Sequence, residues 1–127
     1  MIGISILILE DDRDTIELFA ASLSKLGAEV RTAMSAEDAL EILATWRPTI
    51  ILCDLHLPGV DGYGFLERVR AIPELRTTPI IAISASHPEL ERDKSIEAGF
   101  AAHLTKPTKL KDVVGAVMRL TASLAAT

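Results

Sequence analysis

The sequence predicts a doubly wound α/β fold, with a five-stranded parallel sheet and helices on both faces. Short apolar runs alternate with helical patterns five times along the 127 residues. Three of these runs, ILIL, TIILC and PIIAI, are almost continuously apolar and rich in β-branched residues. Strands with this composition are covered on both faces, as in parallel sheets between helical layers. The length suits one domain, and we expect residues 1–127 to form it.

The expected strands are short and are joined to the helices by short connections, which favours right-handed crossovers. They comprise Ile4–Leu9, Ala28–Thr32, Thr49–Cys53, Pro79–Ile83 and Ala101–Leu104. Cys53 is the only cysteine, so it cannot form an internal disulfide, and its apolar run predicts simple core packing.

Four of the five expected helices carry a clear apolar stripe. Gly27 is expected to end the first helix, and Ser35 to cap the second. The stripes contain Ile16, Phe19 and Leu23; Ala36, Ala39 and Leu43; Phe65, Leu66 and Val69; and Val113, Val117 and Leu120. The fourth helix, near Pro88–Ala98, has only Leu90 and Ile96 as large apolar residues, so we expect it to be held loosely.

Composition and charge exclude several classes of function. The net charge is −5, and no cluster of Lys and Arg offers a nucleic-acid footprint, so direct nucleic-acid binding is not expected. The N-terminal apolar run is too short for a signal peptide or a membrane span. We therefore expect a cytoplasmic protein that does not insert into membranes.

Polar residues from four separate segments are expected to meet at one edge of the sheet, because parallel strands end at the same edge. They are Glu10 and Asp11 after the first strand, Asp54 after the third, Ser84 after the fourth and Lys106 after the fifth. At ~4 Å and an effective dielectric of ~20, each pair of like charges costs about 4 kcal/mol, so clustered carboxylates need a cation. A few oxygen ligands suit Mg²⁺, which retains several waters.

This combination contains the parts needed to phosphorylate an aspartate. A carboxylate is a usable nucleophile toward phosphorus, and a divalent cation with a fixed ammonium lets an anionic donor approach it. The Ser84 hydroxyl can donate to a further oxygen. Each residue also has a simpler interpretation: Asp12 could serve only as a helix N-terminal charge, and Ser84 or Lys106 alone would be ordinary surface residues.

These residues resemble the receiver domains of two-component response regulators over essentially the whole chain. The matching motifs are ILILEDD, DLHLPGVDG around Asp54, the pair Ser84-Ala85, Ala98-Gly99 and the pair Lys106-Pro107. The resemblance implies the flavodoxin-like sheet order 2-1-3-4-5. It also implies a phosphoacceptor switch rather than an enzyme, with a phosphohistidine on a sensor histidine kinase or phosphotransfer protein as donor and an unidentified output protein or domain as target.

The resemblance also implies a role for each site residue. Asp54 is the phosphoacceptor, and Ser84 and Lys106 contact the phosphoryl group. Mg²⁺ is bound by Asp11, Asp54 and the backbone carbonyl of His56, and Glu10 acts through a water. The output face is the fourth helix, fifth strand and fifth helix, and the Lys106–Pro107 peptide is expected to be cis.

The chain departs from the family pattern at one position of the fifth strand. The family usually carries there an aromatic residue whose orientation follows the conformational state, and this chain carries His103. With Ser84 it is the expected switch pair, although a surface histidine without a switching role is the alternative. His56 and Ser86 occupy positions that tune dephosphorylation in the family.

Two other functions stay open. One is a receiver-like interaction module that is never phosphorylated. The other is a Mg²⁺-dependent phosphohydrolase that works through an aspartyl phosphate. Such enzymes carry a second aspartate as general acid two residues after the nucleophile, but this chain has His56 at that position.

Overall fold

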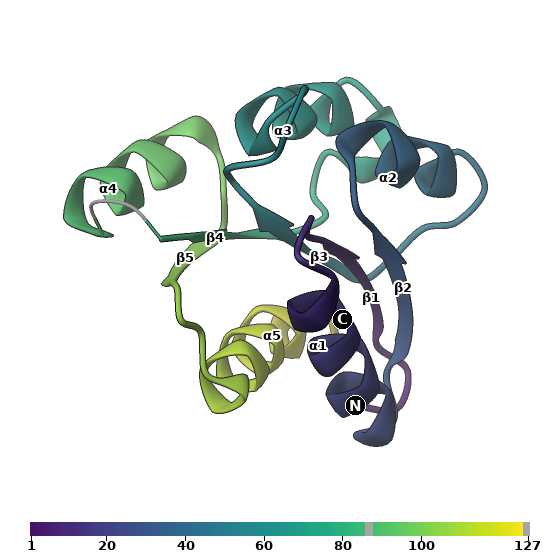
Figure 1. The fold of residues 1–127 in the computed structure, drawn as a ribbon. Coiled ribbons are helices and arrows are strands. Elements are labelled where there is room, and N and C mark those ends of the chain that lie inside the picture. The colour runs from purple at the N-terminus through teal and green to yellow at the C-terminus, as the bar shows by residue number, and fades with distance from the viewer. Residues whose placement is uncertain (86–87, 126–127) are drawn as a thin grey trace.

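The computed structural model describes residues 1–85 and 88–125, and within them five parallel strands form one sheet flanked by five α-helices (Figure 1). The strand order is β2-β1-β3-β4-β5, and every neighbouring pair is parallel. The predicted fold class and strand order are therefore confirmed. The strands are β1 Ser5–Leu9, β2 Glu29–Ala33, β3 Ile50–Asp54, β4 Ile80–Ser84 and β5 Ala102–Thr105. The α-helices are α1 Arg13–Lys25, α2 Ala36–Leu43, α3 Gly62–Arg70, α4 Pro88–Ala98 and α5 Leu110–Ala125, with a short 3₁₀ turn at Pro73–Leu75.

Each strand begins one residue later than its apolar run predicted, and all but β1 also end one residue later. Asp54 and Ser84 are thus the last residues of β3 and β4, opposite Ile83 and Thr105 in the parallel ladder. The hydrogen-bonding groups of a strand belong to its backbone, so a polar side chain does not prevent the last residue from pairing. Both polar side chains are consequently held by the rigid sheet rather than by a loop.

The helices cover the two faces of the sheet unequally. Helices α1 and α5 pack on one face, and α2, α3 and α4 lie on the other, with α4 toward the β5 edge (Figure 1). Successive strand residues serve opposite layers: Ile6 and Ile8 join the core under α1 and α5, whereas Leu7 and Leu9 join the core under α2 and α3. Cys53 is buried in the core under α2 and α3, and its core packing is as predicted.

The predicted helix signals are present in the structure. Ser35 caps α2 by accepting a hydrogen bond from the Asp38 amide at 3.2 Å. Gly27, after α1, has a φ of 102°, in the left-handed region that glycine tolerates best. Asp12 caps α1 by accepting a hydrogen bond from the Thr15 amide at 3.0 Å, which agrees with its interpretation as a helix N-terminal residue.

Helix α4 has the predicted bounds and buries little apolar surface. Leu90 is 74% exposed and Ile96 is 45% exposed. Among the residues that the structure describes, no helix is both long and apolar enough to cross a bilayer.

Candidate functional site

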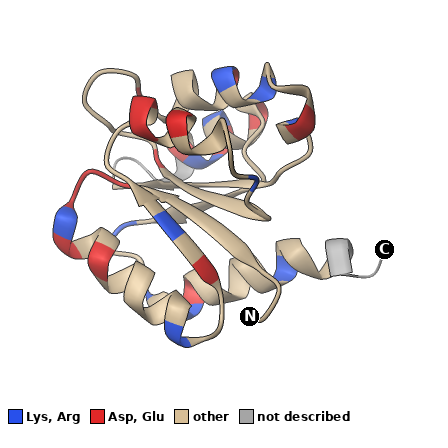
Figure 2. Cartoon of the chain, turned by 90° about the vertical axis from the view of Figure 1, so that its right-hand side faces the viewer, with Lys and Arg blue, Asp and Glu red and all other residues tan. Residues whose placement is uncertain are grey.

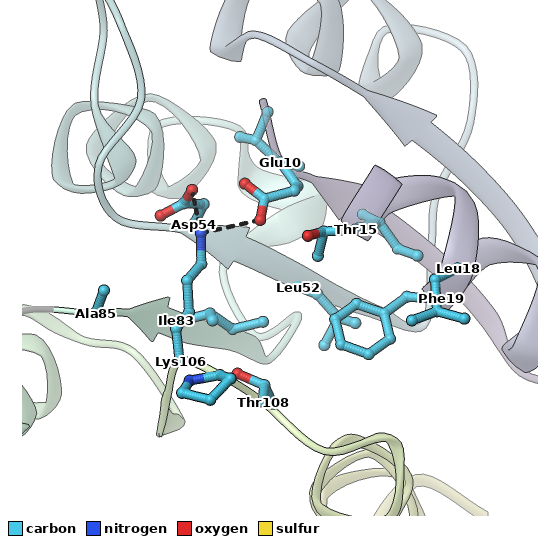
Figure 3. A pocket seen from close by; sticks show the side chains of 13 residues that line it. Glu10, Thr15, Leu18, Phe19, Leu52, Asp54, Ile83, Ala85, Lys106 and Thr108 are labelled. Carbon is cyan, nitrogen blue, oxygen red and sulfur yellow. Dashed lines mark hydrogen bonds and ion pairs between the residues drawn. The ribbon is translucent and has the colours of Figure 1, made fainter. Parts of the chain in front are cut away.

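A lysine ammonium joins two buried carboxylates at the carboxyl edge of the sheet. Asp54 ends β3 and Glu10 follows β1, and they are only 4% and 5% exposed. The Lys106 Nζ atom lies 2.9 Å from Asp54 Oδ2 and 2.9 Å from Glu10 Oε1 (Figure 3). Residues distant in the sequence therefore meet as predicted, because three parallel strands deliver them to one edge.

Backbone amides hold the remaining carboxylate oxygens. The His56 N–H donates to Asp54 Oδ1 at 3.0 Å. The Asp11 N–H donates to Glu10 Oε2 at 2.9 Å. Each buried carboxylate thus has a partner on both oxygens, which fixes its orientation.

The acidic residues form a group that fits a hard divalent cation. Glu10, Asp11 and Asp54 each offer one oxygen, and these atoms lie within 4.8 Å of one another. Asp11 is exposed on the acidic turn between β1 and α1, the red loop at the left of Figure 2, so the group opens to solvent on one side. Oxygen ligands with room for waters are the coordination that Mg²⁺ prefers.

One ammonium does not fully compensate the two buried carboxylates. Burial first, and then the adjacent Asp54 carboxylate, raise the pKa of Glu10 from 4.5 to about 7. Burial alone would raise the pKa of Asp54, but hydrogen bonds with Glu10, His56 and Lys106 lower it overall. Burial likewise opposes the charge on Lys106, but its two carboxylate partners raise the pKa of the ammonium. The site therefore favours an ionised Asp54 and would accept further positive charge.

Ser84 and His103 contact each other at the neighbouring strand ends. The Ser84 side chain is completely buried at the end of β4, and its Oγ lies 2.9 Å from His103 Nε2 on β5. His103 is half-buried, and this burial, as the largest influence, lowers the pKa of its imidazole. His103 is therefore a partly buried residue with a side-chain contact to Ser84, not a solvated surface histidine. Its switching role stays a prediction. Ser86, expected beside the site, lies outside the described residues.

The Lys106–Pro107 peptide is cis, as the family resemblance implied. A cleft of about 410 Å³ opens beside Lys106 and is lined mainly by apolar side chains, among them Phe19, Leu52 and Ile83 (Figure 3). The Asp54 carboxylate therefore lies between a polar rim and an apolar wall.

Sequence reasoning missed one part of the surroundings of the site. The His56 imidazole Nε2 lies 2.9 Å from Oε1 of Glu91 on α4. The other oxygen of the same carboxylate accepts a hydrogen bond from the Tyr63 hydroxyl of α3 at 2.9 Å. The sequence carries no signal for these contacts, because the three residues come from separate elements with no shared motif.

The fold and the site together define a class of protein: a parallel α/β domain with an acidic, cation-fitted pocket and a lysine at the carboxyl edge of its sheet. The chain matches the family model of the response regulator receiver domain over residues 6–118. It belongs to this family and is a receiver domain of two-component systems.

Individual relatives agree with the family assignment. The chain is 34% identical over 105 residues to the transcriptional regulatory protein AfsQ1 of Streptomyces coelicolor, covering 83% of this chain and 45% of that protein. It is 33% identical over 126 residues to hybrid signal transduction histidine kinase D of Dictyostelium discoideum. That match covers 93% of this chain and 8% of the kinase. The chain thus spans less than half the length of these two curated relatives.

A solved structure of similar size is also closely related in fold. The receiver domain of sensor histidine kinase PA1611 from Pseudomonas aeruginosa, solved with a magnesium ion coordinated in its active site cleft, has a TM-score of 0.85 at 30% identity. The match covers 94% of this chain and 98% of that one.

Proposed function

We propose that this chain is a phosphoacceptor switch in which Asp54 takes a phosphoryl group from a phosphohistidine. The observation that carries the proposal is the pairing of the buried Asp54 carboxylate with Lys106 at 2.9 Å, next to two further acidic side chains. Receiver domains in general act in this way and are not enzymes in the ordinary sense. We further propose that residues 1–127 form a single domain.

The transfer step is a displacement at phosphorus. One carboxylate oxygen of Asp54 attacks, a P–O bond forms, the P–N bond to the donor imidazole breaks, and the imidazole nitrogen keeps the electron pair. The lowered pKa of Asp54 keeps this nucleophile ionised. Lys106 is positioned to move its ammonium from the carboxylate to a phosphoryl oxygen, and Ser84 offers a hydroxyl at the next strand end.

Mg²⁺ is the cofactor that the donor set fits. Asp11, Asp54 and the His56 backbone carbonyl would bind it directly, and Glu10 through a water. When bound, the ion neutralises the charge that builds up between the acidic side chains and the incoming phosphoryl group. The raised pKa of Glu10 is consistent with this need for a cation.

The switch would act through the strand ends beside Asp54. Phosphorylation adds about −1.5 to −2 charges at the end of β3. The Ser84 hydroxyl would turn toward the new oxygens and release His103, to which it is now bonded. The proposed output face is formed by α4, β5 and α5, for a partner that remains unidentified. A sensor histidine kinase or phosphotransfer protein would be the donor, in the cytoplasm.

A receiver-like module that is never phosphorylated is the alternative function. The same residues would then form a purely structural ion-pair cluster. The phosphohydrolase alternative has less support, since position 56 carries a histidine whose imidazole contacts Glu91 instead of offering a carboxylic acid.

Phosphoryl labelling separates these functions. With Mg²⁺ and radiolabelled acetyl phosphate, the wild type should take up label stoichiometrically, and Asp54→Asn should take up none while keeping its circular dichroism spectrum. Asp61→Asn is the matched control, since Asp61 lies in the following loop and caps α3, a task that asparagine also performs. Labelling of Asp54→Asn to the wild-type level would refute the proposal, and release of many phosphates per protein would favour a hydrolase.

A further inference from the structure

The Glu91 carboxylate connects α4 to α3 and to the loop after β3. The large apolar residues of this helix are mainly turned to solvent, whereas the Glu91 side chain is only 11% exposed. Its Oε2 accepts a hydrogen bond from the Tyr63 hydroxyl at 2.9 Å, and its Oε1 lies 2.9 Å from His56 Nε2. We call the triad of His56, Tyr63 and Glu91 the Glu91 bridge.

The tyrosine end of the bridge is firmly fixed. The Tyr63 ring packs edge-on against Phe100, with 5.7 Å between the ring centroids and 86° between their planes. Phe100 is 3% exposed, and the Lys94 ammonium covers the Tyr63 ring at 4.6 Å from its centroid. Burial first, and then Glu91, raise the pKa of the Tyr63 phenol, so it keeps its proton and donates. Glu91 therefore has a defined position relative to α3.

The histidine end of the bridge reaches the proposed phosphoacceptor. The His56 backbone N–H donates to Asp54 Oδ1 at 3.0 Å, while its side chain contacts Glu91. A carboxylate only accepts hydrogen bonds, so the Nε2 atom that faces Glu91 carries a proton. One residue thus contacts Asp54 through its backbone and α4 through its side chain.

We propose that Glu91 is a positioning residue that couples the state of Asp54 to the position of α4 through His56. This inference rests on the proposed function. A phosphoryl group on Asp54 changes the oxygen that the His56 amide meets, so the loop after β3 must adjust. The imidazole moves with that loop, and Glu91 either follows it or loses the contact.

The hydrogen bonds of this connection differ from the Ser84–His103 contact, which runs from β4 to β5, although the Glu91 charge also acts on His103. It starts from the loop after β3 and reaches α4 directly. Because coupling is reciprocal, a partner that displaces Glu91 by binding α4 would also alter the surroundings of Asp54.

Tyr63 provides a specific probe, because it is the only tyrosine in the chain. Protein grown with 3-fluorotyrosine gives one ¹⁹F resonance from the centre of the bridge. Beryllofluoride with Mg²⁺ serves as the phosphoryl mimic, and its bound fluorides report occupancy of the site separately. We expect the Tyr63 resonance of the wild type to shift on saturation.

Glu91→Ala should reduce this shift at least twofold while bound beryllofluoride is still observed. Glu97→Ala is the matched control: Glu97 lies on the same helix, is exposed, and its loss removes the same charge. It should retain the wild-type shift. Glu91→Gln is the second variant; its amide oxygen can still accept from Tyr63, but it removes the negative charge that faces His56 Nε2, so the shift should again fall.

The outcomes separate the inference from the function on which it rests. A full wild-type shift in both Glu91 variants, with beryllofluoride bound, would overturn the coupling and leave the phosphoacceptor function intact. An equal loss in Glu97→Ala would also overturn it, because charge alone would then explain the effect. Failure of the wild type to bind beryllofluoride would overturn the proposed function and the inference together.

Discussion

Replacing Glu10 with glutamine should stabilise the fold at alkaline pH and have little effect in acid. The Glu10 side chain is 5% exposed and shares the Lys106 ammonium with Asp54. Burial first, and then Asp54, raise its pKa from 4.5 to about 7. Glutamine has nearly the same shape as protonated glutamate and cannot ionise, so the variant isolates the effect of this one charge.

The magnitude follows from linkage between protonation and folding. The native protein holds the Glu10 proton more tightly than the unfolded chain does, so the wild type loses stability as the pH rises from 4.5 to about 7. At 1.36 kcal/mol per pKa unit the full loss is about 3 kcal/mol. The cleft beside Glu10 is open to water, which screens part of this cost, so we expect a gain of ~1–3 kcal/mol for the variant at pH 8 and under ~1 kcal/mol at pH 5.

Urea unfolding followed by far-ultraviolet circular dichroism, in EDTA to remove divalent cations, measures both values. Asp12→Asn is the control, because Asp12 is exposed and its hydrogen bonds with Thr15 lower its pKa below 3.8, so its effect should be constant between pH 5 and pH 8. Adding Mg²⁺ at pH 8 should shrink the Glu10→Gln gain, since the ion stabilises the carboxylate of the wild type. An equal effect of Glu10→Gln at the two pH values, or a less stable variant at pH 8, would refute the electrostatic reasoning.

Three further predictions concern other parts of the site. Gly62→Ala should destabilise the fold by ~1–3 kcal/mol in urea unfolding, because its Cβ would lie 2.8 Å from the main chain just after β3. Gly115→Ala, whose Cβ meets nothing within 4 Å on α5, should instead stabilise it by ~0.5–1 kcal/mol, and a loss at Gly115 equal to that at Gly62 would contradict this account. Lys106→Met should slow acetyl phosphate labelling about 100-fold or more, since an ammonium aimed at the transferred group is lost; a rate within threefold of wild type would count against its role. Glu91→Ala should lower the Tyr63 pKa toward 10, leaving the increase due to burial, so the variant should lose less stability than wild type as the pH rises above 10. Absorbance of the ionised phenol measures this pKa, and an unchanged value would show that Glu91 does not accept from Tyr63.

Periodicity and strand order explain why so much of the site was predictable. Apolar runs located the central strands, and parallel pairing then required Asp54, Ser84 and Lys106 to lie at one edge. The strand ends were displaced by one residue because side-chain polarity marks the end of an apolar run, whereas backbone pairing decides the end of a strand. A chemistry could be proposed because it depends on residue type and on the edge of the sheet, both of which can be inferred from a sequence.

The Glu91 bridge could not be predicted in the same way. Glu91 and Glu97 are the same residue type on one helix, yet the first is largely buried and the second is exposed. An apolar stripe normally shows which side of a helix faces the core. Helix α4 has no such stripe, so nothing in its sequence indicates which of its acidic side chains turns inward. Its orientation depends on Tyr63 and His56, which belong to other elements.

The way α4 is attached suits an element that must move. A helix held by buried leucines resists displacement, since each large apolar side chain removed from the core costs about 2–5 kcal/mol. A hydrogen bond contributes only about 0.5–1.5 kcal/mol net, and it depends strongly on distance and angle. The two hydrogen bonds that Glu91 accepts therefore help to position α4, and both can be exchanged for about 1–3 kcal/mol. A phosphoryl group that alters the contacts of His56 by this amount would change the ratio of the two α4 positions by roughly 5- to 150-fold, since 1.4 kcal/mol is a factor of ten. Packing α4 with apolar residues instead would stabilise the domain but raise the free energy needed to move the helix. The proposed switch would then respond weakly to its own phosphorylation.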